Sequence, residues 1–227
     1  MAGATGSPTG KSASTSTNVY VATRELLHGV AEWLLSGPQY QRAGTIRLRV
    51  TDLGIATADG LVAIEGGELA VRFDEQVRRF PLAGTVASLG LAVGIDAGVP
   101  KDLYSDHSPV SPSSLLALDS AAVERVLAWF RRGQKGLLAF HAEAEPVLWP
   151  EHFDLGITRS EVNYGISPGD SYHPEPYAYV GPWKLRTGSF WNAPFGAVRP
   201  ADELVDAAAI AGFFEEGARL AETDPVA

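Results

Sequence analysis

The sequence contains no cysteine, which excludes a disulfide framework, a thiolate zinc site, an iron–sulfur cluster and a cysteine nucleophile. Basic residues are also scarce: 18 Lys and Arg stand against 27 Asp and Glu, for a net charge of -9. Because phosphate binding needs clustered cations, we expect no nucleic-acid partner. No apolar run approaches the roughly 18 residues that span a bilayer, so we expect no membrane partner either.

Hydrophobic residues make up 45% of the 227 residues, enough for a core that needs neither metal nor disulfide to fold. Residues 1–18 are almost entirely Gly, Ala, Ser and Thr, which cannot bury a core, so they predict a disordered tail. The tail lacks the apolar segment of a secretory signal, and we expect a cytoplasmic protein. A single domain is predicted over residues 19–227.

The patterning along the chain predicts an α+β fold, with a mainly antiparallel sheet and about three packing helices. Helical spacing of apolar residues predicts helices near 22–36, 119–132 and 201–222, the first of them ending at Gly37-Pro38. Strict alternation predicts a half-buried strand over Thr45–Thr51, and short strands separated by tight turns follow it. No internal sequence repeat is detectable.

The region 146–200 differs from the rest of the chain. It holds eight of the fifteen prolines and ten of the twenty-one aromatic residues, and the prolines exclude a long helix. Short strands are predicted at Leu155–Arg159, Val162–Ser167, Tyr177–Gly181 and Ser189–Asn192. Rigid turns between strands are places where proteins position binding groups.

Three motifs in this region are long and specific: VLWPEHFD, NYGISPGDSYHPEPYAYVGPW and FWNAPFG. They resemble motifs of a family of uncharacterised proteins from high-GC Gram-positive bacteria. The segment TRELLHGVAEWLLSGPQYQRAGTIRLRV resembles the N-terminal half of the same family. The resemblance implies a single-chain soluble bacterial protein, and it implies no activity or catalytic residue.

The motifs favour a small-molecule pocket built from residues 149–196, with tyrosine and tryptophan rings as walls and polar side chains as orienting groups. The ligand-binding residues predicted on this basis are Trp149, Asn163, Tyr164, Asp170, Glu175, Tyr177, Trp191 and Asn192.

An enzyme is the alternative function. His152 or His173 would act as a general acid or base if a nearby carboxylate fixes its tautomer, and Asp154 is the third predicted catalytic residue. The same three side chains could instead bind a metal, because His152 and Asp154 share one face of an extended segment.

A purely structural role is also open, in which Asp170 stabilises its own turn and Glu175 pairs with Arg159 or Arg186. Exposed aromatic residues could instead form a protein interface. The sequence determines neither a cofactor nor the oligomeric state.

Overall fold

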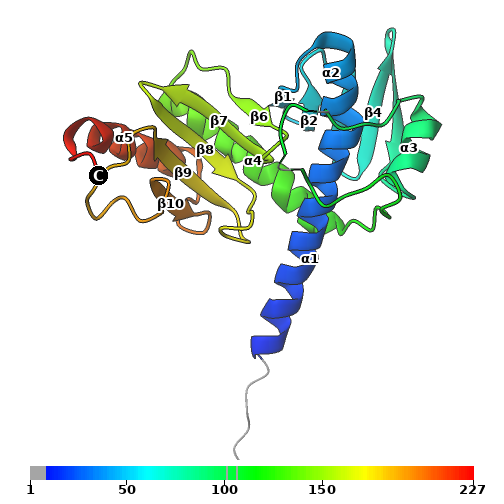
Figure 1. Ribbon diagram of the computed structural model, residues 1–227. Coiled ribbons are helices and arrows are strands. Elements are labelled where there is room, and N and C mark those ends of the chain that lie inside the picture. The colour runs from blue at the N-terminus through cyan, green and yellow to red at the C-terminus, as the bar shows by residue number, and fades with distance from the viewer. Residues whose placement is uncertain (1–8, 101, 106) are drawn as a thin grey trace, which may run out of the picture.

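The computed structural model describes residues 9–100, 102–105 and 107–227 (Figure 1). The first half contains, in order, α1 (Thr9–Val30), the π-helix η1 (Ala31–Ser36), α2 (Gly37–Ala43), β1 (Leu48–Val50), β2 (Gly54–Thr57), β3 (Val62–Glu65), β4 (Glu68–Phe73), β5 (Gln76–Pro81) and α3 (Val86–Val93). The second half contains α4 (Ser120–Phe140), β6 (Val147–Trp149), β7 (Asp154–Arg159), β8 (Val162–Ser167), β9 (Tyr177–Pro182), β10 (Ala197–Pro200) and α5 (Ala207–Thr223).

All of these strands join one ten-stranded antiparallel sheet in the order β10-β9-β8-β7-β6-β1-β2-β3-β4-β5. The predicted α+β class with a mainly antiparallel sheet is therefore confirmed. Each half runs helix, five-stranded meander, helix, so the architecture is duplicated although no sequence repeat is detectable. The two meanders meet where β1 pairs with β6, through Leu48 opposite Leu148.

The register of the strands separates two faces of the sheet. One face carries Leu148, Leu155, Ile166 and Ala178, all of them fully buried. Helix α4 packs closely on this core face, since a Cβ at its Gly133 would lie 2.3 Å from the Ile166 side chain. Figure 1 shows α4 crossing behind β7 and β8. The polar side chains at the alternate positions therefore point to the opposite face, where the candidate site lies.

Helix α4 begins at an N-cap, Asp119, whose side chain accepts a hydrogen bond from the Ala122 N–H. It runs past the predicted end near 132 to Phe140. Helix α5 begins later than predicted, because the Asp206 side chain caps it by accepting from the Ala209 N–H. Local caps, rather than the apolar stripe alone, therefore determine where these helices begin.

The first helical segment differs from its prediction at both ends. It begins at Thr9, so residues 9–18 of the expected disordered tail are helical, and residues 1–8 lie outside the described residues. The chain also continues through Gly37-Pro38. A π-turn makes this possible, because the Gly37 N–H reaches back five residues to the Glu32 carbonyl.

Gly37 is required by a close backbone approach. A Cβ at this position would lie 1.6 Å from the carbonyl oxygen of Gly98, and the Gly98 N–H donates to the Trp33 carbonyl at 3.0 Å. The loop after α3 is therefore held directly against the π-helix.

Candidate functional site

The site is built around the turn between β6 and β7, which contains the WPEHFD motif. Helix α1 holds this turn: His28 Nε2 donates to the Pro150 carbonyl at 2.6 Å, and its ring stacks on Phe153 at 5.1 Å. Phe153 is buried and adopts a φ of 51°, a left-handed conformation that is costly for a bulky residue. The surrounding packing therefore imposes this turn, and such imposed conformations concentrate at functional sites.

Helix α1 also holds the loop between β8 and β9, which contains the PGDSYHPEPY motif. The Tyr20 hydroxyl donates to the Pro168 carbonyl at 2.6 Å, and Arg24 donates to the Pro174 carbonyl at 3.0 Å. Within the loop, Asp170 accepts hydrogen bonds from the Tyr172 and His173 N–H groups and from the Tyr177 hydroxyl. One helix thus brings the two motifs together.

Two pockets meet at this point. The sheet-face pocket, of about 450 Å³, lies over the polar face of β6 to β9 and is lined by Arg47, Trp149, Asp154, Asn163 and Tyr179, among others. The helix-side pocket, of about 560 Å³, lies toward α1 and is lined by His28, His107, Phe153, Asp170, Tyr177 and Phe195, among others. Both pockets share Glu151, His152, Asp154 and Tyr179, which we call the partition.

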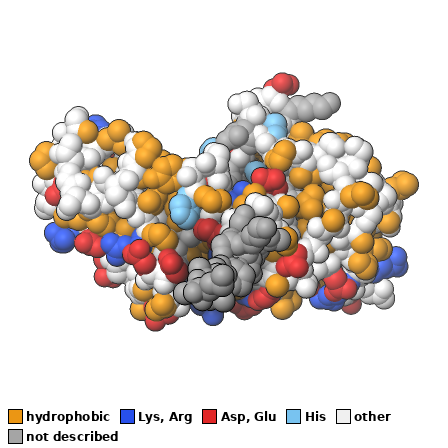
Figure 2. Space-filling view, turned by 90° about the horizontal axis from the view of Figure 1, so that it is seen from below, with side chains coloured by type: hydrophobic (Ala, Val, Ile, Leu, Met, Phe, Trp, Pro, Cys, Tyr) orange, Lys and Arg blue, Asp and Glu red, His pale blue; other side chains and the backbone are white. Residues whose placement is uncertain are grey.

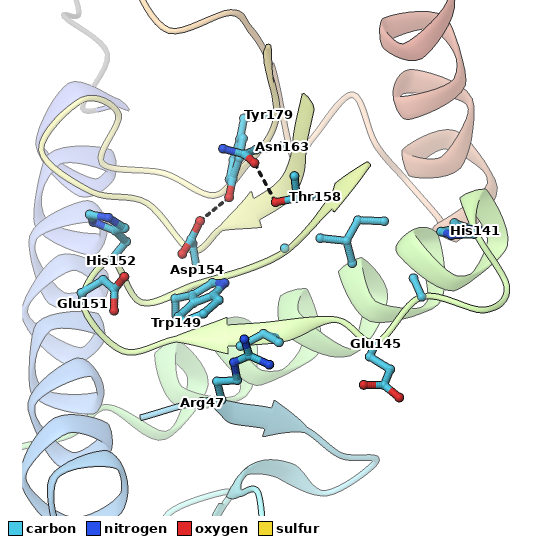
Figure 3. A pocket seen from close by; sticks show the side chains of 14 residues that line it. Arg47, His141, Glu145, Trp149, Glu151, His152, Asp154, Thr158, Asn163 and Tyr179 are labelled. Atoms are coloured by element: carbon cyan, nitrogen blue, oxygen red, sulfur yellow. Dashed lines mark hydrogen bonds between the residues drawn. The ribbon is translucent and has the colours of Figure 1, made fainter. Parts of the chain in front are cut away.

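The figures show this arrangement. In the space-filling view the molecule is hollowed between its two lobes, and histidine side chains lie at the margin of the hollow (Figure 2). In the close view of the sheet-face pocket, Asp154 and Tyr179 point toward each other (Figure 3). Glu151 and His152 lie at the end nearest α1, whereas His141 and Glu145 lie at the opposite end.

Two strand glycines allow Tyr179 to reach Asp154. Tyr179 lies on β9 opposite Gly165 of β8, which in turn lies opposite Gly156 of β7. A Cβ at Gly165 would lie 2.4 Å from the Tyr179 hydroxyl oxygen, and a Cβ at Gly156 would lie 3.2 Å from it. The ring therefore lies across two side-chain-free positions and donates its hydroxyl to Asp154 Oδ2.

Asp154 has an unusual environment for a carboxylate. It is only 9% exposed, and burial raises its pKa to about 6, although the Tyr179 hydrogen bond and nearby His152 oppose this effect and Glu151 adds to it. Its Oδ1 atom is buried and accepts no hydrogen bond from the described residues, and the same holds for Glu151 Oε2. Two carboxylate oxygens of the partition thus lack a donor within the described chain.

A second buried carboxylate, Glu32, holds two residues that line the helix-side pocket, His107 and Ser108. Glu32, in the π-helix, is fully buried and accepts hydrogen bonds from the Tyr104 hydroxyl, His107 Nδ1 and the Ser108 N–H, at 3.0, 2.9 and 2.8 Å. Burial, followed by the Glu32 charge, raises the pKa of Tyr104 far above its ordinary value. The network fastens Tyr104, His107 and Ser108 to the π-helix, and His107 and Ser108 line the pocket.

The structure brings several of the predicted site residues together. Trp149 and Asn163 line the sheet-face pocket, and Asp170 and Tyr177 line the helix-side pocket. His152 and Asp154 lie in the partition between them, and residues of both the WPEHFD and the PGDSYHPEPY stretches line the helix-side pocket.

Other predicted residues lie elsewhere. Tyr164 is buried on the core face against Phe140 and Phe214. Trp191 donates to Asp224 at 2.9 Å, and Asn192 bonds both backbone groups of Val198. These three side chains fasten the C-terminal segments and line neither pocket.

His173 and Glu175 also line neither pocket. His173 Nδ1 bonds the Glu175 carbonyl at 2.8 Å, and the Glu175 carboxylate pairs with Arg125, a partner that the sequence did not suggest. Within the part of the chain that the structure describes, no group of three or more histidine and carboxylate side chains could hold a metal ion. The predicted set of His152, Asp154 and His173 therefore finds no support as a metal site.

Sequence reasoning missed the contribution of α1 and of Tyr104, His107 and Ser108. His28 and His107 were outside the predicted site, yet both line the helix-side pocket, and Glu32 holds His107 there by a hydrogen bond. One signal was available: His28 and Glu32 are four residues apart, so a helix places them on one face, and their side chains approach to 3.8 Å.

Comparison of the chain with protein-family models, with curated proteins and with solved structures gives no significant match. Among the described helices, none combines the length and the apolar character needed to cross a membrane.

Proposed function

We propose that this protein binds a small organic molecule at the partition between its two pockets. The observation that carries the proposal is Asp154 Oδ1, a buried carboxylate oxygen that accepts no hydrogen bond from the described residues and belongs to a residue that lines both pockets. Buried polar atoms in folded proteins are nearly always satisfied. A ligand that donates a hydrogen bond to this oxygen would explain why the fold keeps the carboxylate there.

The fixed geometry around Asp154 also supports a binding role. Tyr179 holds Oδ2, so the carboxyl plane is oriented before a ligand arrives and the cost of ordering it is already met. The helix-side pocket adds the rings of Phe153, Tyr177 and Phe195 as apolar walls. Its volume of about 560 Å³ is within the range of pockets that take small organic ligands.

Acid–base catalysis on the bound molecule is a second candidate, favoured by one observation. A pKa of about 6 means that Asp154 exchanges its proton near neutral pH, which is what a general acid or base requires. In this role Asp154 would transfer the proton and Tyr179 would orient it, whereas His173 would take no part.

The binding proposal is tested by recording amide NMR spectra of the protein with a library of neutral, cationic and anionic fragments. We expect a subset of fragments to shift the signals of residues 150–154 and 177–179, and to do so more weakly in Asp154→Asn. Asp202→Asn is the matched control, since Asp202 is exposed and lines neither pocket. A library that leaves these signals unmoved, or that binds Asp154→Asn as well as wild type, would refute the role given to Asp154.

A further inference from the structure

The chemistry of the partition indicates which class of molecule would bind there, an inference that rests on the proposed function. Glu151 Oε2 and Asp154 Oδ1 are both buried, both belong to residues that line the two pockets, and neither accepts a hydrogen bond from the described residues. The Glu151 charge raises the pKa of Asp154, so the two carboxylates lie close enough to repel each other. Two neighbouring carboxylate oxygens without donors among the described residues favour a ligand that both donates hydrogen bonds and carries positive charge.

The other charged groups of the helix-side pocket do not supply that cation in full. Arg24 is engaged with the Pro174 carbonyl and lies 3.7 Å from Glu25. His28 donates to the Pro150 carbonyl, and His107 donates to Glu32. His152 acts on Asp154 and lowers its pKa, yet burial dominates and the pKa remains raised. Carboxylates therefore outnumber arginines and lysines among the residues that line the helix-side pocket, which disfavours an anionic ligand there.

The pocket walls suit a cation with an organic skeleton. Tyr177 and Tyr179 lie with their ring centroids 6.5 Å apart, and Phe153 and Phe195 line the same pocket. The faces of aromatic rings carry partial negative charge and attract ammonium groups, while they also bury carbon chains. A bare metal ion would gain nothing from these walls, and the described residues offer no set of three ligands for one.

We propose that the site binds a monocationic organic amine. Its ammonium group would donate hydrogen bonds to Glu151 Oε2 and Asp154 Oδ1, and its carbon skeleton would lie against Phe153 and Tyr177 in the helix-side pocket. A neutral polyol could satisfy the same two acceptors, but it would leave the carboxylate charges uncompensated in a partly buried setting.

The test uses matched pairs that differ only in the cation: phenethylamine with phenethyl alcohol, and cyclohexylmethylamine with cyclohexylmethanol. Binding is followed at pH 7.5 by isothermal titration calorimetry and by the amide signals of residues 150–154. We expect each amine to bind at least about tenfold more tightly than its alcohol, because charge-assisted hydrogen bonds are roughly twice as strong as neutral ones. Glu151→Gln and Asp154→Asn should each remove most of that difference, whereas Asp202→Asn should leave it intact.

The pH dependence provides an independent readout. Amine affinity should fall about tenfold per pH unit below pH 6, because Asp154 becomes protonated while the amine stays charged. Alcohol affinity should not fall in this way. Other groups that titrate or carry charge also line the two pockets, so the Asp154→Asn variant is needed to assign the effect. They are Arg24, Glu25, His28, Arg47, His107, His141, Glu145, Glu151, His152, Asp170, Tyr177 and Tyr179.

The outcomes separate the two proposals. Alcohols that bind as tightly as their amines, with the same signals shifted, would overturn the amine inference and leave the binding proposal standing. If neither amine shifts the partition signals while neutral or anionic fragments do, the amine inference again fails alone. If no amine, alcohol or library fragment shifts these signals, both proposals fail together.

Discussion

Replacement of Asp154 by Asn should stabilise the protein at neutral pH, an uncommon result for a buried polar residue. Folding raises the pKa of Asp154 from 3.8 to about 6, chiefly through burial, so the folded protein holds this proton more tightly than the unfolded chain does. The stability contributed by the neutral carboxyl is therefore present at low pH. It is lost as the pH rises from about 4 through about 6.

The magnitude follows from the size of the shift. A difference of about 2 pKa units, at about 1.4 kcal/mol per unit, corresponds to about 3 kcal/mol of stability lost once the carboxyl is ionised. Asn has the shape of the neutral acid and can still accept from the Tyr179 hydroxyl. For a chain of this length we expect the Tm to rise by roughly 6–12 °C at pH 7.5.

The assay is urea unfolding, followed by circular dichroism, of wild type and Asp154→Asn from pH 4 to pH 8. The two proteins should be almost equally stable at pH 4 and should diverge to a plateau above pH 7. Asp170→Asn is the control of opposite sign, since Asp170 accepts three hydrogen bonds from its own loop and from Tyr177, and the variant should be less stable. A variant Asp154→Asn that is no more stable than wild type at pH 7.5 would refute the account of this carboxyl.

Three further substitutions test other parts of the site. Gly37→Ala should destabilise the protein by more than about 3 kcal/mol in urea unfolding, because its Cβ would lie 1.6 Å from a backbone carbonyl oxygen that cannot move freely; a smaller loss would contradict the close approach. Gly165→Ala should displace the Tyr179 ring and so weaken fragment binding at the partition. Unchanged binding would contradict the inference that Gly165 makes room for this ring. Glu32→Gln should speed amide hydrogen exchange at His107 and Ser108 by about tenfold, whereas an unchanged rate would show that other contacts hold these residues.

Much of the secondary structure could be predicted because its signals are local. Alternation over Thr45–Thr51 placed the strand around β1, and the short strands expected after it correspond to β2 to β5. The predicted strands at Leu155–Arg159, Val162–Ser167 and Tyr177–Gly181 correspond closely to β7, β8 and β9. Each of these segments shows its own pattern of buried and exposed residues, so it could be predicted without knowing which strands it pairs with.

Segments without such a pattern were missed or misplaced. β6 spans only Val147–Trp149, too short for alternation to show, and its pairing with β1 joins the two halves of the sheet. The strand expected at Ser189–Asn192 is absent from the structure, and β10 lies instead at Ala197–Pro200. At Gly37-Pro38 a π-turn carried the chain through a signal that normally ends a helix.

The sequence by itself determined the candidate motifs and the chemical types that they offer: carboxylates, imidazoles and aromatic rings on proline-rigid turns. Only the tertiary structure decided which of them meet. The bond between His28 and Pro150 links residues 122 positions apart, and the bond between Arg24 and Pro174 links residues 150 positions apart. Local periodicity reports whether a side chain is buried, but it does not report against what, because that depends on the packing of α1 and the joining of two meanders into one sheet.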